Sequence, residues 1–98
     1  MKIGLSSRAV DDLECVGKYI AEDDPVRAGS FLAELRLAIL GLEEMPRRFP
    51  LVPRYERHGI RRRAWKGYAV LYSIEPDRLF VHRILGPGRD LDRALGLG

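Results

Sequence analysis

The sequence predicts an α+β fold, in which an N-terminal strand precedes an antiparallel helical hairpin packed on an antiparallel β-meander. Three observations predict it. Apolar residues recur at helical spacing in two runs before residue 46, three apolar runs of strand length follow residue 58, and short turn motifs separate those three runs. With 98 residues, the chain has room for a single domain, residues 1–98, in the order β-α-α-β-β-β.

The first elements are a short strand and a helix. Residues 2–5 alternate polar and apolar side chains and lead into Ser6-Ser7, either of which suits a helix N-cap. A helix over roughly residues 7–22 follows, because one of its faces is apolar. That face consists of Ala9, Leu13, Val16 and Ile20.

A second helix is predicted from Pro25 to Pro46. Asp24 suits its N-cap and Pro25 its first turn, where a missing amide hydrogen costs nothing. The turn at Asp23-Asp24 is so short that the two helices should pack as an antiparallel hairpin. The apolar stripe of this helix is Ala28, Phe31, Leu35, Ala38, Leu42 and Met45, widened by Leu32 and Ile39.

The second half predicts a loop, three strands and a short tail. Residues 46–58 contain three prolines among arginines and are predicted to form a long ordered loop. The strands are expected over residues 60–65, 68–74 and 78–85, with turns at Lys66-Gly67 and Glu75-Pro76-Asp77. After Gly86-Pro87-Gly88, residues 89–95 are expected to form one or two helical turns.

The middle strand carries apolar side chains on both of its faces. Tyr68, Val70 and Tyr72 alternate with Ala69 and Leu71. Since the helical hairpin covers one face, we expect the other to be open in the isolated chain and covered by a partner.

Composition narrows the class of protein. Apolar residues make up 46% of the chain and charged residues of both signs 32%, which argues against intrinsic disorder. Charge interrupts every apolar run long before a membrane-spanning length, and no signal segment opens the chain, so we expect a cytoplasmic protein. The single cysteine, Cys15, has no partner for an internal disulfide.

The positive charge lies in the second half. Residues 1–45 hold 5 Lys/Arg and 9 Asp/Glu, and residues 46–98 hold 12 and 5, giving −4 and +7 for the total of +3. This asymmetry favours a surface for a polyanion or an acidic protein. The alternative is a solvated sheet edge that its arginines keep soluble.

No catalytic or metal-binding constellation is evident from the spacing. His58, His82 and Cys15 are too far apart in the sequence to predict a metal site, and we expect no cofactor. Tyr68, Tyr72, His82 and Glu75 are the candidates for proton transfer, without a convincing arrangement. We therefore predict no catalytic residues.

An arginine set on the predicted strands is the clearest candidate for binding. Arg61 and Arg63 share a strand face with Trp65, and Arg83 lies on another strand. Guanidinium groups beside an aromatic ring suit contacts with carboxylates or nucleobases. Equally, Trp65 could cover the edge of the core while the arginines stay solvated.

Several different short motifs follow one another along the whole chain. They are Ala9, Asp12, Leu13 and Tyr19-Ile20; Pro25, Ala28, Phe31, Leu35, Leu42 and Pro46; then Gly59-x-Arg61, Gly67-Tyr68-x-Val70-x-Tyr72, Val81-x-Arg83-Ile84-Leu85 and Arg89-Asp90. With these spacings the chain resembles the ParE/RelE superfamily of bacterial type II toxins, and the ParE branch in particular. The resemblance implies the same β-α-α-β-β-β fold.

Resemblance to ParE implies a toxin that poisons DNA gyrase by binding and is not itself an enzyme. It implies a ParD-like antitoxin whose acidic segment folds on the toxin, a hetero-oligomeric complex, and contact with operator DNA only through the antitoxin. We expect the antitoxin to contact Arg61, Arg63, Arg83 and Leu71. We expect the target to contact Trp65, Arg89, Asp90 and Leu91.

Two other functions stay open. The RelE branch cleaves messenger RNA in the ribosome, but its members carry an arginine where this chain has Ala69, and a catalytic tyrosine or histidine in a tail that here offers Asp90, Leu91, Asp92 and Leu95. The other alternative is a relative without toxicity that only binds its partner.

Overall fold

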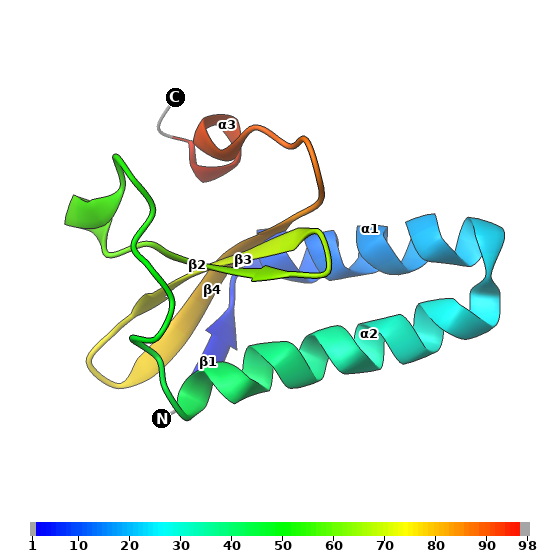
Figure 1. Cartoon of the computed structure of the whole chain (residues 1–98), viewed down its shortest axis with the longest axis horizontal. Helices are drawn as coiled ribbons and strands as arrows, with labels where there is room; N and C mark the ends of the chain where they lie inside the picture. The colour runs from blue at the N-terminus through cyan, green and yellow to red at the C-terminus, as the bar shows by residue number, and fades with distance from the viewer. Residues whose placement is uncertain (1, 97–98) are drawn as a thin grey trace.

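The elements follow one another along the chain in the predicted order (Figure 1). The computed structural model describes residues 2–96. Its helices and strands are β1 (Lys2–Leu5), α1 (Ser7–Asp23), α2 (Pro25–Leu40), β2 (Arg61–Trp65), β3 (Tyr68–Ile74), β4 (Arg78–Leu85) and α3 (Leu91–Leu95), with 3₁₀ turns at Gly41–Glu43 and Glu56–His58. The predicted α+β fold is confirmed.

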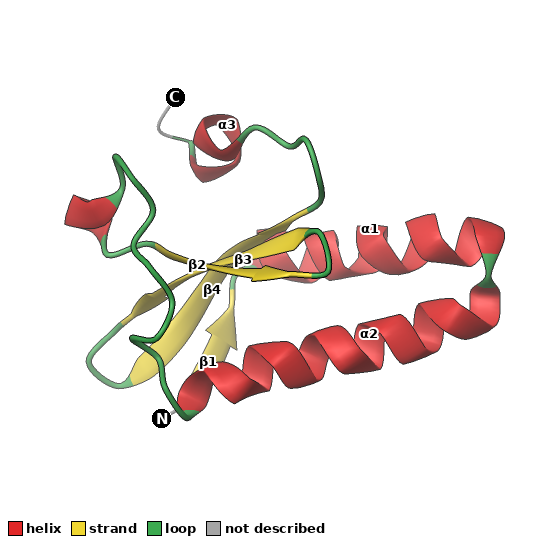
Figure 2. Ribbon diagram, viewed as in Figure 1, coloured by secondary structure: helices red, strands yellow, loops and turns green. Residues whose placement is uncertain are grey.

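The four strands form one mixed sheet in the order β1-β4-β3-β2 (Figure 2). β2, β3 and β4 make the predicted antiparallel meander. β1 pairs with β4 in parallel, a pairing that the sequence does not predict. The turn between β2 and β3 has Lys66 and Gly67 at φ 46° and 85°, as a tight hairpin of matching twist requires.

A capping side chain fixes the N-terminus of each helix of the hairpin. Ser6 Oγ accepts a hydrogen bond from the amide of Ala9 and donates one to the carbonyl of His82, which ties the start of α1 to β4. Asp24 accepts from the amide of Arg27, and Pro25 occupies the first turn of α2, as predicted. At Gly17 the two helices are so close that a Cβ would lie 2.8 Å from Cδ1 of Leu32.

The predicted end of the second helix is wrong. α2 ends at Leu40, and the chain tightens into the 3₁₀ turn Gly41–Glu43 before Pro46. Glycine is a poor helix former, and the tighter turn directs Leu42 into the core while leaving Met45 61% exposed. The helical spacing of Leu42 and Met45 therefore continues past the helix itself.

The main core lies between the hairpin and the near face of the sheet. Its fully buried side chains include Leu35 and Leu42 of the helical segment and Val70, Tyr72, Leu79 and Val81 of the sheet. We call this side of the sheet the helix face and the opposite side the outer face.

The expectation of an open outer face is wrong. Val52, Tyr55 and Ile60 from the loop pack there against Ala69, Leu71 and Leu85, and the apolar side of α3 adds Leu91, Ala94 and Leu95. The loop is held in place because the Pro50 carbonyl accepts from the amide of Arg62 and Leu51 bridges to Arg61. The chain thus covers with its own segments much of the surface that we assigned to a partner.

Candidate functional site

The three arginines assigned to the antitoxin do not form one cluster. Arg61 and Arg63 pair across the sheet with Tyr72 and Val70, whose side chains face the helices. Arg83 pairs instead with Leu71, which belongs to the outer face. The register between β3 and β4 shifts beyond Leu71. Because of this shift, Arg83 lies on the outer face, whereas simple alternation along β4 would place it on the helix face with Val81.

Arg61 and Arg63 gather around Phe49 at the edge of the helix face. Arg61 Nη1 donates to the Phe49 carbonyl at 2.7 Å, while the guanidinium groups of Arg63 and Arg48 lie 4.7 and 5.6 Å from the Phe49 ring centre. Arg63 Nε is buried and has no hydrogen-bond partner among the described residues. We call Arg48, Phe49, Arg61 and Arg63 the Phe49 cluster.

Arg83 is committed to contacts within the chain. Its Nε and Nη2 atoms donate to the two carboxylate oxygens of Asp12 at 2.8 and 2.9 Å, and its Nη1 donates to the Ala94 carbonyl. Asp12 also accepts from the amide of Ile84. The hydrogen bond to Asp12 raises the pKa of Arg83, and both side chains are only 13% exposed. This arrangement joins α1, β4 and α3.

Leu71 lies fully buried beneath Val52, Tyr55 and α3. A partner could reach it only by displacing those segments. The contacts proposed for Arg83 and Leu71 therefore lack the exposed surface that the sequence led us to expect, and their role in binding stays a prediction.

A groove of about 560 Å³ lies between α1 and the end of the sheet. Its lining residues come from α1, the start of β3 and the segment after β4: Asp12, Cys15, Val16, Tyr19, Tyr68, Ile84, Gly86, Pro87 and Arg89. Tyr19 is 69% exposed on its rim. The Tyr68 ring lies beside Gly86, where a Cβ would be 3.4 Å from Cε1. Burial raises the pKa of Tyr68, so its hydroxyl stays protonated.

Two of the four residues assigned to the target lie at or next to this groove. Trp65 is paired with Tyr68 across the β2–β3 turn and packs edge-on against Phe31 at 5.2 Å. Arg89 lines the groove and is exposed. Gly67 of the same turn approaches Pro87, so both residues border one end of the molecule.

Asp90 and Leu91 have structural positions in α3. Asp90 caps this helix by accepting from the amide of Arg93, and Leu91 packs against the outer-face cluster. Asp92 accepts hydrogen bonds from Tyr55 and Arg54. The bond from Tyr55 lowers the pKa of Asp92, which keeps this carboxylate ionised at neutral pH.

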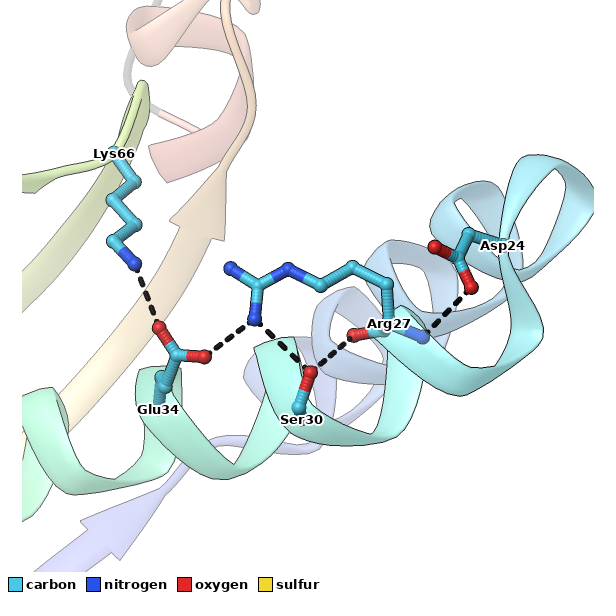
Figure 3. A network of polar contacts seen from close by, with 5 residues as sticks. All are labelled: Asp24, Arg27, Ser30, Glu34 and Lys66. Atoms are coloured by element: carbon cyan, nitrogen blue, oxygen red, sulfur yellow. Dashed lines mark hydrogen bonds and ion pairs between the residues drawn. The ribbon is translucent and has the colours of Figure 1, made fainter.

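A polar network holds the β2–β3 turn against α2 (Figure 3). Glu34 accepts from Arg27 at 2.5 Å and from Lys66 at 2.6 Å. These two bonds lower the pKa of Glu34 to about 2. Since Lys66 also lies 5.1 Å from the Trp65 ring centre, the network helps to position Trp65 beside the groove.

The four candidates for proton transfer lie in three places: Tyr68 lines the groove, Tyr72 lies on the helix face, and His82 and Glu75 line another pocket. Burial raises the pKa of Tyr72 and lowers that of His82, whose Nε2 lies 2.7 Å from Ser73 Oγ. Tyr72 donates to the Pro46 carbonyl on the helix face. Within residues 2–96, no three His, Cys, Asp or Glu side chains form a group that could hold a metal ion. None of the helices in that range is long and apolar enough to cross a membrane.

Comparison with known protein families identifies the family of this chain. A family model described as the ParE toxin of the type II toxin-antitoxin system parDE matches residues 3–91. The chain belongs to this family.

A solved structure described as the chromosomal ParDE TA system from P. aeruginosa has a similar fold. The TM-score is 0.75 at 14% sequence identity, over 89% of this chain and 96% of that one. At this identity the likeness concerns the fold. No curated protein matches the chain in sequence.

Sequence reasoning did not predict where several residues lie in the site of this ParE-family toxin. The pairing of Asp12 with Arg83 joins positions 71 apart, and no local pattern predicts it. Tyr19 and Cys15 lie on the more exposed side of α1 and so gave no signal in the search for a core stripe. Phe49 gave only a weak signal: it follows two arginines and precedes a proline in the loop, and a large aromatic side chain usually buries much of its apolar area.

Proposed function

We propose that this ParE-family toxin inhibits DNA gyrase by binding to it, and that a ParD-like antitoxin neutralises it. The observation that carries the proposal is the family match over residues 3–91, which spans every element from β1 to the start of α3. The groove beside Trp65 and Arg89 offers an exposed cation and aromatic side chains for a protein target.

The site chemistry favours binding over RNA cleavage. Ala69, where RelE-like enzymes carry an arginine, is buried in the outer-face cluster. In the tail, the Asp92 carboxylate is occupied by Tyr55 and Arg54. Arginines can stabilise phosphate charge but do not exchange protons near neutral pH. The Phe49 cluster could therefore bind a phosphate group but contains no general acid or base.

A supercoiling assay with purified gyrase tests the target. We expect the toxin to block supercoiling of relaxed plasmid and to leave messenger RNA on ribosomes intact in a parallel reaction. Arg89→Ala should raise the concentration needed for inhibition at least about tenfold, as the loss of a central contact does. Arg93→Ala is the matched control, since Arg93 is an exposed arginine of the same segment that does not line the groove.

Either of two results would contradict the gyrase proposal. Cleavage of ribosome-bound messenger RNA with no effect on gyrase would favour RelE chemistry. Inactivity in both assays, together with a lack of growth arrest on expression, would favour a relative that only binds its partner.

For the antitoxin, we propose that its acidic segment contacts the Phe49 cluster through Arg61 and Arg63. Both residues are partly exposed, and neither forms an ion pair within the described chain. Reversing both charges, Arg61→Glu with Arg63→Glu, should weaken the complex by a few kcal/mol if the pairs are desolvated, as measured by calorimetry. Arg62→Glu is the control because Arg62 lies between them but on the outer face, and an equal loss there would disprove the specific contact.

A further inference from the structure

α2 is apolar on two of its faces. One face is buried in the core through Ala28, Leu35 and Ile39. On the opposite side Val26, Leu37 and Leu40 are 86%, 68% and 54% exposed. A helix that presents apolar side chains all round normally buries them all, so the second face of α2 needs a partner.

The exposed positions follow the spacing of a coiled-coil seam. Val26, Ser30, Ala33, Leu37, Leu40 and Glu44 step by 4, 3, 4, 3 and 4 residues, and all six are exposed. Glu44 lies beyond α2 but keeps helical backbone angles. We call these six residues the α2 seam. Spacing of this kind packs best against another helix of matching period.

We infer that the α2 seam is the interface for a second copy of this chain, with the two α2 helices antiparallel. In that orientation the central layers pair large side chains with small ones. Leu37 faces Ala33 of the partner subunit, and Leu40 faces Ser30 of the partner subunit. Alternation of large and small residues across facing layers allows close packing, and the twofold axis repeats each layer.

Burying Ser30 in this interface leaves no hydroxyl unsatisfied. Ser30 Oγ already donates to the Arg27 carbonyl and accepts from Arg27 Nη1 within its own helix (Figure 3). The layer can therefore close without an orphaned polar group, which would otherwise weaken it.

The charges at the two ends of α2 favour an antiparallel second copy over a parallel one. Glu22 and Asp23 are exposed beside the N-terminus of α2, and the exposed charges beyond its C-terminal end are mixed: Glu43, Glu44, Arg47 and Arg48. Antiparallel packing brings Glu22 and Asp23 of one subunit toward this mixed end of its partner, whereas parallel packing brings the two acidic ends together. An acidic antitoxin segment fits the seam less well, because it would meet Glu22, Asp23 and Glu44.

The seam is separate from the groove, so the inference does not depend on the proposed target. The groove is lined by α1, β3 and the segment after β4, and α2 contributes nothing to it. A chain that failed to inhibit gyrase could still form this dimer, and a monomeric chain could still inhibit it.

Sedimentation velocity on the full chain, at increasing concentration and without antitoxin, tests the inference. We expect a monomer–dimer equilibrium. Leu37→Glu should raise its dissociation constant at least about tenfold, because it buries a charge in the central layer. At a concentration at which both chains are monomeric, the thermal midpoint should not change, since Leu37 is exposed in the monomer. Val10→Glu, an equivalent substitution on the exposed side of α1, should leave the dimer intact.

A disulfide test checks the orientation, in a Cys15→Ser background. Oxidation of an equal mixture of Ala33→Cys and Leu37→Cys chains should give mainly the mixed dimer, since these positions face each other only in the antiparallel register. A chain that is monomeric at every concentration, or equal dimerisation by the Leu37→Glu variant, would overturn the inference. So would predominant linkage of Ala33→Cys chains to one another. If Leu37→Glu instead abolishes antitoxin binding by a monomeric chain, the seam belongs to the antitoxin.

Discussion

The arginines of this chain differ in their contacts, although the sequence does not distinguish them. Arg83 uses its guanidinium to bind Asp12 at both oxygens and to contact α3. Arg61 uses part of its group to hold the Phe49 carbonyl. Arg89, in contrast, is exposed at the groove. The +7 charge of the second half is therefore partly structural, and only those guanidinium groups that keep nitrogen atoms free of internal hydrogen bonds bear on the choice of partner.

At this scale the sharpest prediction concerns Asp12. Asp12→Ala should lower the free energy of unfolding by about 2–4 kcal/mol, because it leaves the mostly buried Arg83 without its counter-charge and the Ile84 amide without an acceptor. Asp12→Asn should lower the free energy of unfolding by less, since its side-chain amide oxygen can still accept the hydrogen bond from the Ile84 amide. Urea unfolding measures both.

The neighbouring carboxylate provides the control for Asp12. Asp11 is exposed and none of its contacts reaches β4 in the described structure, so Asp11→Ala should change stability by less than about 0.5 kcal/mol. Equal losses at positions 11 and 12 would mean that the Asp12–Arg83 pair contributes nothing specific.

At the scale of elements, α2 positions the β2–β3 turn through Glu34. Its ordinary pKa of 4.5 falls to about 2 in the folded chain because Arg27 and Lys66 donate hydrogen bonds to it. A carboxylate with a depressed folded pKa stabilises the fold above its unfolded pKa, and this contribution is lost as the pH falls through the folded value. Because Glu34 is well exposed, solvent screening keeps the effect small.

We predict a pH-dependent difference between wild type and Glu34→Gln. Wild type should be the more stable at pH 7, and the two should converge as the pH falls from about 4.5 toward 2. Thermal unfolding over this pH range measures the difference. Glu14→Gln is the control, since Glu14 is an exposed acid of α1 that forms no ion pair within the described residues. A constant gap between wild type and Glu34→Gln across the range would contradict the role of the Glu34 carboxylate.

Most element boundaries could be predicted because the signals are local. The turns at Lys66-Gly67 and Glu75-Pro76-Asp77 set the ends of β3, and Asp24-Pro25 fixes the start of α2. The end of α2 could not be predicted, because Leu42 and Met45 keep the helical spacing of apolar residues beyond Gly41. The pairing of β1 with β4 joins segments more than seventy residues apart, and a four-residue strand carries no signal for its neighbour.

The site was predicted less well than the fold for a physical reason. Alternation along β4 would place Arg83 on the same face as Val81, but the shift in register beyond Leu71 reverses that. Likewise, the apolar outer face of β3 predicts that other residues pack on it, but the sequence does not indicate which segment supplies them. The loop with Tyr55 and the short helix α3 provide that cover from within the chain.

On the scale of the whole molecule, the chain is built in layers around the sheet. The helical hairpin covers the helix face, and the loop with α3 covers the outer face (Figure 1). The groove opens where these layers meet, between α1 and the segment that leads from β4 to α3. The docking of α3 thus sets the course of the segment that carries Arg89.

Removal of α3 tests this coupling between stability and target binding. A chain that ends at Asp90 keeps Arg89 but uncovers Leu71 and Leu85, and loses the apolar contacts of Leu91, Ala94 and Leu95. Partial burial of these three side chains corresponds to about 2–3 kcal/mol of stability. We expect that loss in urea unfolding, together with binding of an apolar dye to the exposed outer face.

The truncated chain should also fail to inhibit gyrase at a temperature at which circular dichroism shows it folded, because Arg89 is no longer held at the groove. The double variant Leu91→Ala with Leu95→Ala keeps the backbone of α3 and should be intermediate in both stability and inhibition. If the truncated chain is folded and inhibits supercoiling as well as wild type, then α3 serves stability alone and the position of Arg89 does not depend on it.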